Sequence, residues 1–512
     1  MDLISRIGAP VEIRLDAGNG KGKGVFATKD IPEGETVFNE VPLVSLQHLD
    51  NKASAVVCSR CLRFVGTVET QIGHKLKCLV EKLKGTAEKG EAAAHEEGGA
   101  GEAAAGPADG DATRDAEGSD GVDLEEALEA GERLAQIYAE VSNERIAALC
   151  EGSELLPMSS DFSLPQPVPC RRGCGDMYCS VACEDEAWRH HHCLLCTASA
   201  PASEAAGPST SYSGASGSGA QAAEEAVEEV LGVRVDRRAL AAFAAHAAET
   251  NEIFLLAAQV VASTLLKASR LLSEGGGTAS DAAAVCGALA AAWRPYVYGW
   301  KRCWWEAVAV PEDVEDEDEF RGQLRELAYD SLQLLSAGLA DPRFGPEVLR
   351  LEVYGSIVGL FELNNLGVAV ASPVEDYFLA VDEMEEGPDK EPVAKLTQPL
   401  LDALDAEYAA SAEATAFLAL QSCINHSCDP ACTAACDTGD RTATVLAQRD
   451  IKAGEEITLS YIDVSLSYRE RQAELRDYGF VCRCERCKAE ATAPRKKAAP
   501  GGKGGMRVGK RR

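Results

Sequence analysis

The feature that most constrains the fold of this chain is the grouping of its cysteines. The sequence has 19 cysteines in 512 residues, and many of them stand in close pairs. The start, MDLISRIGAP, forms no hydrophobic signal core, which indicates an intracellular protein. Because thiols stay reduced inside cells, disulfide bonds do not account for the pairs. Closely spaced thiolates can reach one metal ion from a tight turn, so the sequence predicts zinc sites.

The first two groups of cysteines can supply the ligands of two zinc ions. One is CSRC at 58–61, and the other is CRRGCGDMYCSVACEDEAWRHHHCLLC at 170–196. A closed tetrahedral site needs two such pairs and leaves no open position, so both ions are predicted to be structural. The four pairs are Cys58/Cys61, Cys170/Cys174, Cys179/Cys183 and His192/Cys196. Alternatives for the last pair are His190, His191 and Cys193.

A third zinc ion is predicted near the end of the sequence. The stretch CRCERC offers Cys482, Cys484 and Cys487, which is one ligand fewer than a tetrahedral site needs. A fourth thiolate must come from elsewhere in the chain, and CINHSC at 423–428 offers Cys428. We therefore expect this zinc ion to tie the C-terminal segment to the stretch that contains Cys428.

Charge and composition indicate how the chain is divided. The formal net charge of −32 argues against nucleic acid as the main partner and suits a basic substrate. An acidic insertion at about 85–165 and a spacer at 197–235 are rich in Gly, Ala, Ser and Glu, which predicts disorder, with a helix as the alternative for LEEALEAGERLAQIYAEV at 124–141. Residues 236–345 show apolar side chains at i, i+3 and i+4, which predicts helices. The longest apolar run there, Phe254–Leu266, is too short for a membrane span, so no membrane partner is expected.

The end of the sequence is basic. From residue 488 to 512 there are nine Lys or Arg residues against one Glu. The clusters RKK and KRR are typical of a bipartite nuclear address, although a generic solubilising tail has the same composition. We expect the protein in the nucleus, with the cytoplasm as a second location. Nucleic acid is expected to bind only through this tail.

Two further stretches hold candidate site residues. GNGKGKG at 18–24 precedes an alternating strand pattern, and glycines without Cβ atoms let a ligand approach the backbone. A hairpin turn has the same pattern, so this stretch alone does not distinguish a ligand-binding loop from a turn. GEEITLSYID at 454–463 predicts a strand that ends near Tyr461, whose ring belongs either to the core or to a site.

Taken in order, these motifs resemble a known family. Gly-x-Gly near the start, NHSCDP, GEEITLSYID and CxCxxC are similar to the SET-domain protein lysine methyltransferases. The pattern YC-x3-C-x8-H-x3-C resembles the MYND zinc finger, and a MYND finger between two SET halves is typical of the SET-and-MYND family. CSRCLRFVGTVETQIGHKL and FELNNLGVAVASPVEDYFL are similar to the plant trithorax-related branch and to the animal fifth SET-and-MYND type. The resemblance covers residues 8–490, apart from the spacers.

The resemblance implies an α+β architecture. It consists of a SET β-clip fold with a pseudoknot, an inserted MYND finger, an expanded helical insert and a post-SET zinc motif. The implied parts are the SET N-terminal part (8–57), the finger with its acidic insertion (58–196), the linker (197–235), the helical SET insert (236–345), the SET C-terminal part (346–466), the post-SET motif (467–490) and the basic tail (491–512).

The resemblance also implies the role of each motif. Tyr461 matches the catalytic tyrosine of a transferase that takes its methyl group from S-adenosylmethionine. The cofactor site would comprise Lys21, Gly22, Lys23, Gly24, Asn365, Asn425, His426, Tyr461, Tyr478 and Phe480, with Asn364 as the alternative to Asn365. The finger ligands would interleave, as Cys58, Cys61, Cys179 and Cys183 on one ion and Cys170, Cys174, His192 and Cys196 on the other. One departure is Ala431, which stands where the family often has Asn.

The expected substrate is a lysine in a basic protein segment, with histone tails as the first choice. A non-histone substrate is an alternative. A protein without catalysis, whose finger binds proline-rich peptides, is another, although the motif residues needed for catalysis are all present. The mechanism implied is transfer to a neutral lysine in a narrow apolar channel, because burial disfavours the charged ammonium.

Overall fold

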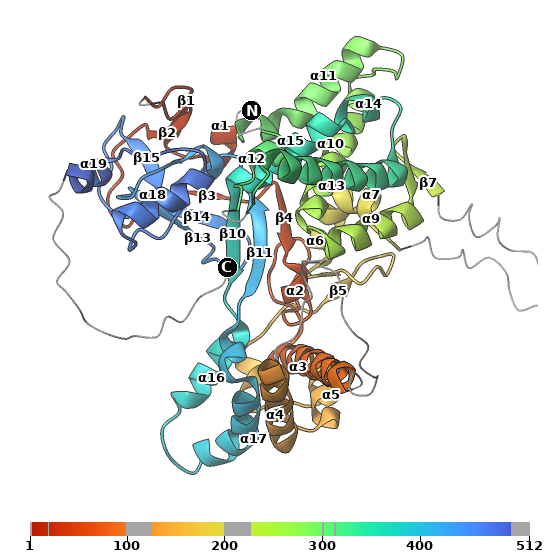
Figure 1. Ribbon diagram of the computed structural model, residues 1–512, viewed down its shortest axis with the longest axis vertical. Helices are drawn as coiled ribbons and strands as arrows, with labels where there is room; N and C mark the ends of the chain where they lie inside the picture. The colour runs from red at the N-terminus through yellow and green to blue at the C-terminus, as the bar shows by residue number, and fades with distance from the viewer. Residues whose placement is uncertain are drawn as a thin grey trace, which may run out of the picture. The chain divides into compact units, whose positions relative to one another are not determined.

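The computed structural model describes residues 3–18, 20–98, 124–198, 227–299, 302–311 and 314–492. The chain divides into two compact units. The large unit comprises Met1–Pro10, Thr36–Cys423 and Ala434–Leu446. The small unit comprises Val11–Glu35, Ile424–Thr433 and Ala447–Arg512. Helices and short sheets occur together, which confirms the predicted α+β class (Figure 1).

The small unit is built on a sheet with the strand order β1-β2-β15-β12. The strands are β1 (Val11–Arg14), β2 (Gly24–Ala27), β15 (Glu456–Leu459) and β12 (Asn425–His426). β2 runs antiparallel to β1 and β15, whereas β12 runs parallel to β15. This pairing brings the glycine loop, the NHSC stretch and the SYID stretch to one sheet. Three motifs that are far apart in the sequence are therefore neighbours in space.

Two helices complete the small unit, α18 (Tyr468–Asp477) and α19 (Glu485–Thr492). α18 begins at a capping box, in which the Ser467 hydroxyl accepts from the Glu470 N–H and the Glu470 carboxylate accepts from the Ser467 N–H. The reciprocal bonds satisfy two N–H groups that a helix start would otherwise leave unpaired. The post-SET cysteines lie in and just before α19.

The large unit contains four short sheets. The first has the order β10 (Asn365–Val370), β11 (Ala412–Phe417), β4 (Val44–Gln47). The second joins β13 (Cys432–Ala435), which crosses the boundary between the units, to β14 (Ala443–Ala447) and β3 (Thr36–Glu40). The others are β7 (Val227–Val230), β8 (Val233–Asp236) and β9 (Leu339–Ala340), and β5 (Val168–Pro169) with β6 (Met177–Tyr178).

Long helices form the predicted helical insert. They are α9 (Arg237–Glu249), α10 (Ile253–Glu274), α11 (Ala282–Trp293), α13 (Glu317–Gly338) and α15 (Leu351–Asn364), with the short turns η3 (Arg294–Tyr298), α12 (Trp304–Ala307) and α14 (Gly345–Val348). By length and composition alone, α10 is apolar enough to cross a membrane, and 67% of its apolar window is buried inside the structure. Its buried side chains belong to the core of the insert.

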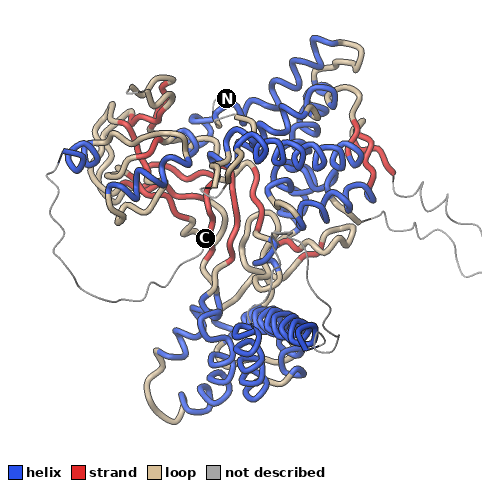
Figure 2. Tube along the Cα trace, in the orientation of Figure 1, coloured by secondary structure: helices blue, strands red, loops and turns tan. Residues whose placement is uncertain are grey.

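A helical lobe corrects the prediction of disorder. α3 (Val68–Gly98), α4 (Leu124–Glu140) and α5 (Asn143–Glu151) pack with α16 (Pro373–Asp382) and α17 (Lys390–Leu404) (Figures 1 and 2). The helix offered as the alternative near 124–141 is present as α4. The disorder predicted for the rest of 85–165 is wrong for the described residues, and 99–123 lie outside them. Charged residues lower the average hydrophobicity of α4, but its apolar side chains recur at helical spacing and form a buried stripe. The buried core includes Ile72, Leu76, Ile137, Leu149 and Leu400.

The spacer at 197–235 also differs from the prediction. Residues 227–236 form β7 and β8, whose branched residues Val233 and Val235 are fully buried. Residues 199–226 lie outside the described part of the chain, as do 493–512 of the predicted basic tail. The remaining elements are α1 (Leu3–Ile7), α2 (Leu49–Lys52), η1 (Ser159–Asp161), α6 (Val181–Ala187), η2 (Trp188–His192), α7 (Cys193–Leu195), η4 (Asp405–Ala409) and η5 (Gln421–Cys423).

Candidate functional site

The C-terminal cysteines of the small unit meet Cys428. The Sγ atoms of Cys428, Cys482, Cys484 and Cys487 all lie within 4.8 Å of one another. Cys428 Sγ is 3.9 Å from Cys482 Sγ and 3.4 Å from Cys487 Sγ. Tetrahedral zinc with Zn–S bonds of about 2.3 Å holds its sulfurs about 3.8 Å apart, so this group fits the ion. Gln472 fixes the loop, because its side chain accepts from the Cys482 N–H at 3.0 Å and donates to the Cys482 carbonyl at 3.2 Å.

The electrostatics of this cluster favour a bound cation. Burial raises the pKa of Cys482 to about 11, and the negative charges of Cys484 and Cys487 act in the same direction. Burial likewise raises the pKa of Cys428. The raised pKa values reflect the cost of burying several thiolates together. A divalent ion would offset that cost, because it holds all of the sulfurs as thiolates.

His426 links the zinc cluster to the Tyr461 segment. The backbone N–H of Tyr461 lies 3.1 Å from Nδ1 of His426, so Nδ1 accepts. Nε2 must then carry the proton, and it lies 3.3 Å from the Sγ atom of Cys428. Burial, together with the positive charges of Lys21 and Arg471, lowers the pKa of His426 to about 4. The imidazole is therefore neutral at pH 7 and fixed in one tautomer.

Asn425 holds the glycine loop against the sheet. Its Nδ2 atom donates to the Lys23 carbonyl at 2.8 Å and to Glu456 Oε1 at 2.9 Å. The other oxygen of Glu456 accepts from Lys21 Nζ at 2.6 Å. Glu456 was not singled out from the sequence. The sequence signal for Glu456 was its position at the start of the strand pattern. In the structure this acidic side chain is partly buried rather than exposed.

The glycines of the loop serve two different needs. Gly22 has φ +73°, which favours glycine, and a Cβ there would meet nothing within 4 Å. Gly24 is buried in β2, where a Cβ would lie 2.8 Å from the Ala17 Cβ and 3.0 Å from Asn425 Nδ2. The loop therefore stays in close contact with Asn425 only if residue 24 has no side chain.

Aromatic rings surround Tyr461. Its ring centroid lies 5.2 Å from that of Tyr478, 5.4 Å from that of His426 and 6.4 Å from that of Phe480. The Tyr461 hydroxyl donates to the Ile424 carbonyl at 2.6 Å. The rings make one side of the site apolar, whereas the hydroxyl and the carbonyl give it a polar end.

Asn365 belongs to the large unit, unlike the other predicted cofactor residues. It is the first residue of β10 and pairs with Phe417. The side chain of the alternative, Asn364, donates to the Leu360 carbonyl at 3.0 Å and so caps the end of α15. That bond favours Asn365 over Asn364 as the ligand, and the assignment stays a prediction.

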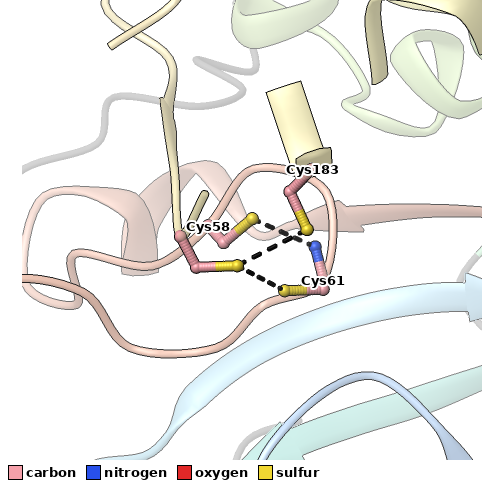
Figure 3. A group of neighbouring side chains, drawn as sticks. Cys58, Cys61 and Cys183 are labelled. Carbon is pink, nitrogen blue, oxygen red and sulfur yellow. Dashed lines mark hydrogen bonds between the residues drawn. The ribbon is translucent and has the colours of Figure 1, made fainter. Parts of the chain in front are cut away.

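The large unit brings together the predicted ligands of both finger ions. The Sγ atoms of Cys58, Cys61, Cys179 and Cys183 lie within 4.8 Å of one another. Figure 3 shows Cys58, Cys61 and Cys183 with their sulfurs converging. Cys179 Sγ lies 3.6 Å from Cys61 Sγ and 3.4 Å from Cys183 Sγ, which again fits tetrahedral zinc.

The second finger cluster contains His192. Its Nε2 atom lies 3.2 Å from Cys170 Sγ and 3.4 Å from Cys174 Sγ, and Cys196 completes the group. Nδ1 of His192 lies 3.6 Å from Asp176 Oδ2. A carboxylate on the second nitrogen orients a metal-binding imidazole. None of His190, His191 and Cys193 contributes an atom to this cluster, within the described residues.

Two buried arginines join the finger to the rest of the large unit. Arg441 donates its backbone N–H to the Cys61 carbonyl at 2.9 Å. The guanidinium of Arg237, at the start of α9, donates to the carbonyls of Cys193, Leu194 and Cys196 at 2.7–2.9 Å. The finger is therefore part of the core of this unit.

Comparison with known proteins agrees with this geometry. A model of the SET domain matches residues 22–462. Histone-lysine N-methyltransferase ATXR2 of Arabidopsis thaliana is 36% identical over 481 residues, which cover 92% of this chain and 89% of ATXR2. Protein-lysine N-trimethyltransferase SMYD5 of Homo sapiens is 32% identical over 185 residues, 35% of this chain and 43% of SMYD5. Histone-lysine N-methyltransferase SET5 of Meyerozyma guilliermondii is 45% identical over 91 residues, 17% of this chain and 19% of SET5. Because the match extends over most of the chain and three cysteine clusters accompany it, this protein belongs to the SET-domain family, in its SET-and-MYND group of protein lysine methyltransferases.

Proposed function

We propose that this protein transfers a methyl group from S-adenosylmethionine to the ε-amino group of lysines in histone tails. The observation that carries the proposal is the convergence of the glycine loop, Asn425, His426 and Tyr461 on the small unit's sheet. The relatives ATXR2 and SET5 are named histone-lysine N-methyltransferases. The formal net charge of −32 also suits a basic substrate.

The residues of the small unit fit the proposed cofactor. When bound, S-adenosylmethionine supplies a methyl group on a positively charged sulfur. The loop 20–24 and Asn425 would hold its methionine part, since Gly22 leaves the backbone open to close approach. Phe480 and Tyr478 would cover its adenine.

The aromatic group would prepare the lysine. A lysine ammonium has an ordinary pKa of about 10.4, so removing its proton at pH 7 costs roughly 4–5 kcal/mol. The rings of Tyr461, Tyr478 and Phe480 disfavour the charged form, because they replace water by apolar surface. The Tyr461 hydroxyl would orient the neutral amine for in-line attack. Glu456 is engaged with Lys21 and Asn425, so we assign it a positioning role.

Calorimetry with Gly24→Ala tests the cofactor site. We expect S-adenosylmethionine to bind the wild-type protein and to bind Gly24→Ala much more weakly, because the added Cβ would displace Asn425. Gly131→Ala in α4 is the matched control, since its Cβ meets nothing within 4 Å. No binding by the wild type would leave an adaptor, for which proline-rich peptides are the finger ligand to try.

The substrate is tested by labelled methyl transfer. The enzyme is offered core histones in one reaction and whole-cell extract in another, and the labelled proteins are compared.

The basic tail is proposed to direct the protein to the nucleus. Its RKK and KRR clusters carry the positive charge that a nuclear address needs. Truncation after Ala491 is expected to move a fluorescent fusion protein from the nucleus to the cytoplasm. An unchanged nuclear signal would assign the tail to solubility alone.

A further inference from the structure

Two arginines that the proposed function leaves unused lie beside cysteine clusters. The Arg441 side chain is in the large unit and that of Arg471 in the small unit. Their exposed fractions are 8% and 0%. Within the described part of the chain, the Nε atom of each is buried without a hydrogen-bond partner. Burying a guanidinium is costly unless an opposite charge lies close to it.

Arg441 adjoins the first finger cluster, because its backbone N–H donates to the carbonyl of the ligand Cys61 at 2.9 Å. Its Nη1 atom donates to the Ser45 hydroxyl at 2.8 Å, which is neutral and offers no compensating charge. Burial and the positive charge of Arg60 lower the pKa of Arg441 to about 10, whereas the thiols of Cys61, Cys58 and Cys183 act in the opposite direction. These sulfurs can compensate the arginine only as thiolates, the form that zinc binds.

Arg471 touches the post-SET cluster directly. Its Nη2 atom lies 3.9 Å from Cys487 Sγ, and its guanidinium also interacts with the Cys428 thiol. Nη2 donates to Glu490 at 2.8 Å as well. Glu490 therefore balances part of the charge, and the sulfurs of the cluster are the other negative groups in contact.

The second finger cluster differs from these two in charge and in surroundings. Zinc with four thiolates carries two net negative charges, whereas zinc with three thiolates and a neutral histidine carries one. The second finger cluster is of the three-thiolate kind, with His192 as its neutral ligand. Arg172, whose backbone N–H lies 3.5 Å from Cys170 Sγ, is already paired with both carboxylate oxygens of Glu228, at 2.6 and 2.7 Å. A buried arginine whose Nε lacks a partner thus accompanies the two four-cysteine clusters.

We propose that Arg441 and Arg471 are the counter-ions of the two tetrathiolate zinc sites. Each would place a fixed positive charge against the dianionic zinc–thiolate group, which stabilises the bound ion and in turn makes the buried arginine tolerable. This inference rests on zinc at the clusters and is independent of methyl transfer.

Zinc release from the full-length protein tests the proposal. Arg441→Met and Arg471→Met remove the charge and keep an apolar side chain, whereas the lysine variants keep the charge. We expect each methionine variant to release one zinc equivalent to a chelator about 10- to 100-fold faster than the wild type, the usual effect of losing an outer partner. The lysine variants should restore most of the retention. Arg63→Met and Arg476→Met are matched controls, because these exposed arginines lie near the same clusters in sequence.

Cobalt substitution separates charge compensation from a structural role. A positive charge beside a thiolate lowers the energy of the sulfur electrons and so raises the energy of sulfur-to-cobalt charge transfer. Removing the arginine charge should therefore shift this absorption band to longer wavelength. A structural role would lower the melting temperature of the methionine variants and leave this band in place. Zinc release at the wild-type rate with an unshifted band would overturn the proposal, whatever the methyltransferase activity. A lysine variant as defective as the methionine variant would overturn it too.

Discussion

Tyr461→Phe is expected to lose about 100- to 1000-fold in turnover, a cost similar to that of losing one oriented hydrogen-bonding group at a reacting centre. Its affinity for S-adenosylmethionine should stay close to that of the wild type. The change removes only the hydroxyl that donates to the Ile424 carbonyl. The ring stays, so its contacts with Tyr478, His426 and Phe480 remain available.

Single-turnover methyl transfer and calorimetry, measured on the same preparation, check this expectation. Tyr468→Phe is the matched control, because Tyr468 packs against the post-SET cluster and is expected to keep its turnover. A Tyr461→Phe variant that methylates at the wild-type rate would show that the hydroxyl has no part in the reaction. Loss of cofactor affinity together with turnover would make Tyr461 a binding residue instead.

Cys482→Ser is expected to abolish cofactor binding and activity. A structural zinc ion contributes on the order of 10 kcal/mol of folding free energy, and Cys482 shares its cluster with Cys428. Cys428 in turn contacts His426, whose Nδ1 atom accepts from Tyr461. Loss of this ion should therefore release both the aromatic group and the NHSC stretch. Zinc content, calorimetry and methyl transfer measure the three consequences.

Cys58→Ser is the matched comparison, because it removes one ligand from a cluster of the large unit. Arg441 and Arg237 tie the finger to the core of that unit, so we expect a lower melting temperature. All predicted cofactor residues except Asn365 lie in the small unit, so cofactor binding should remain measurable. Equal loss of cofactor binding in both variants would refute the separation of the two zinc systems.

The motifs with strict chemistry were predictable from the sequence. Cysteine pairs and the NHSC stretch have few alternative explanations, and the structure places the twelve predicted zinc ligands in three compact groups. The choice of His192 over its neighbours needed three-dimensional information, because adjacent histidines have the same spacing within one residue. Glu456 was missed for a different reason. Its role depends on Lys21 and Asn425, which the sheet brings to it from remote segments.

The sequence indicated a helix near 124–141, but composition did not predict that it belongs to a packed helical lobe. α4 is rich in Glu and Ala, and its buried side chains find their partners in α3 and in α17, the latter from a region more than two hundred residues later. A single helix of that kind has too little apolar surface to indicate a core. The average composition of a long insertion therefore concealed its short amphipathic segments. Such segments become stable helices only when they pack against one another.

The order of strands in the small unit has a consequence for how the protein is made. Lys21 and Glu456 are separated by 435 residues, yet they belong to adjoining segments of one site. During synthesis β2 can pair with β1 at once, but its other edge has no partner until β15 has been made. Such distant pairings form slowly because a very long loop must close. The large unit can begin to fold earlier, since most of its residues are contiguous. A chain that ends after Leu446 but before Glu456 would thus hold every segment of the large unit and lack the strand that completes the site.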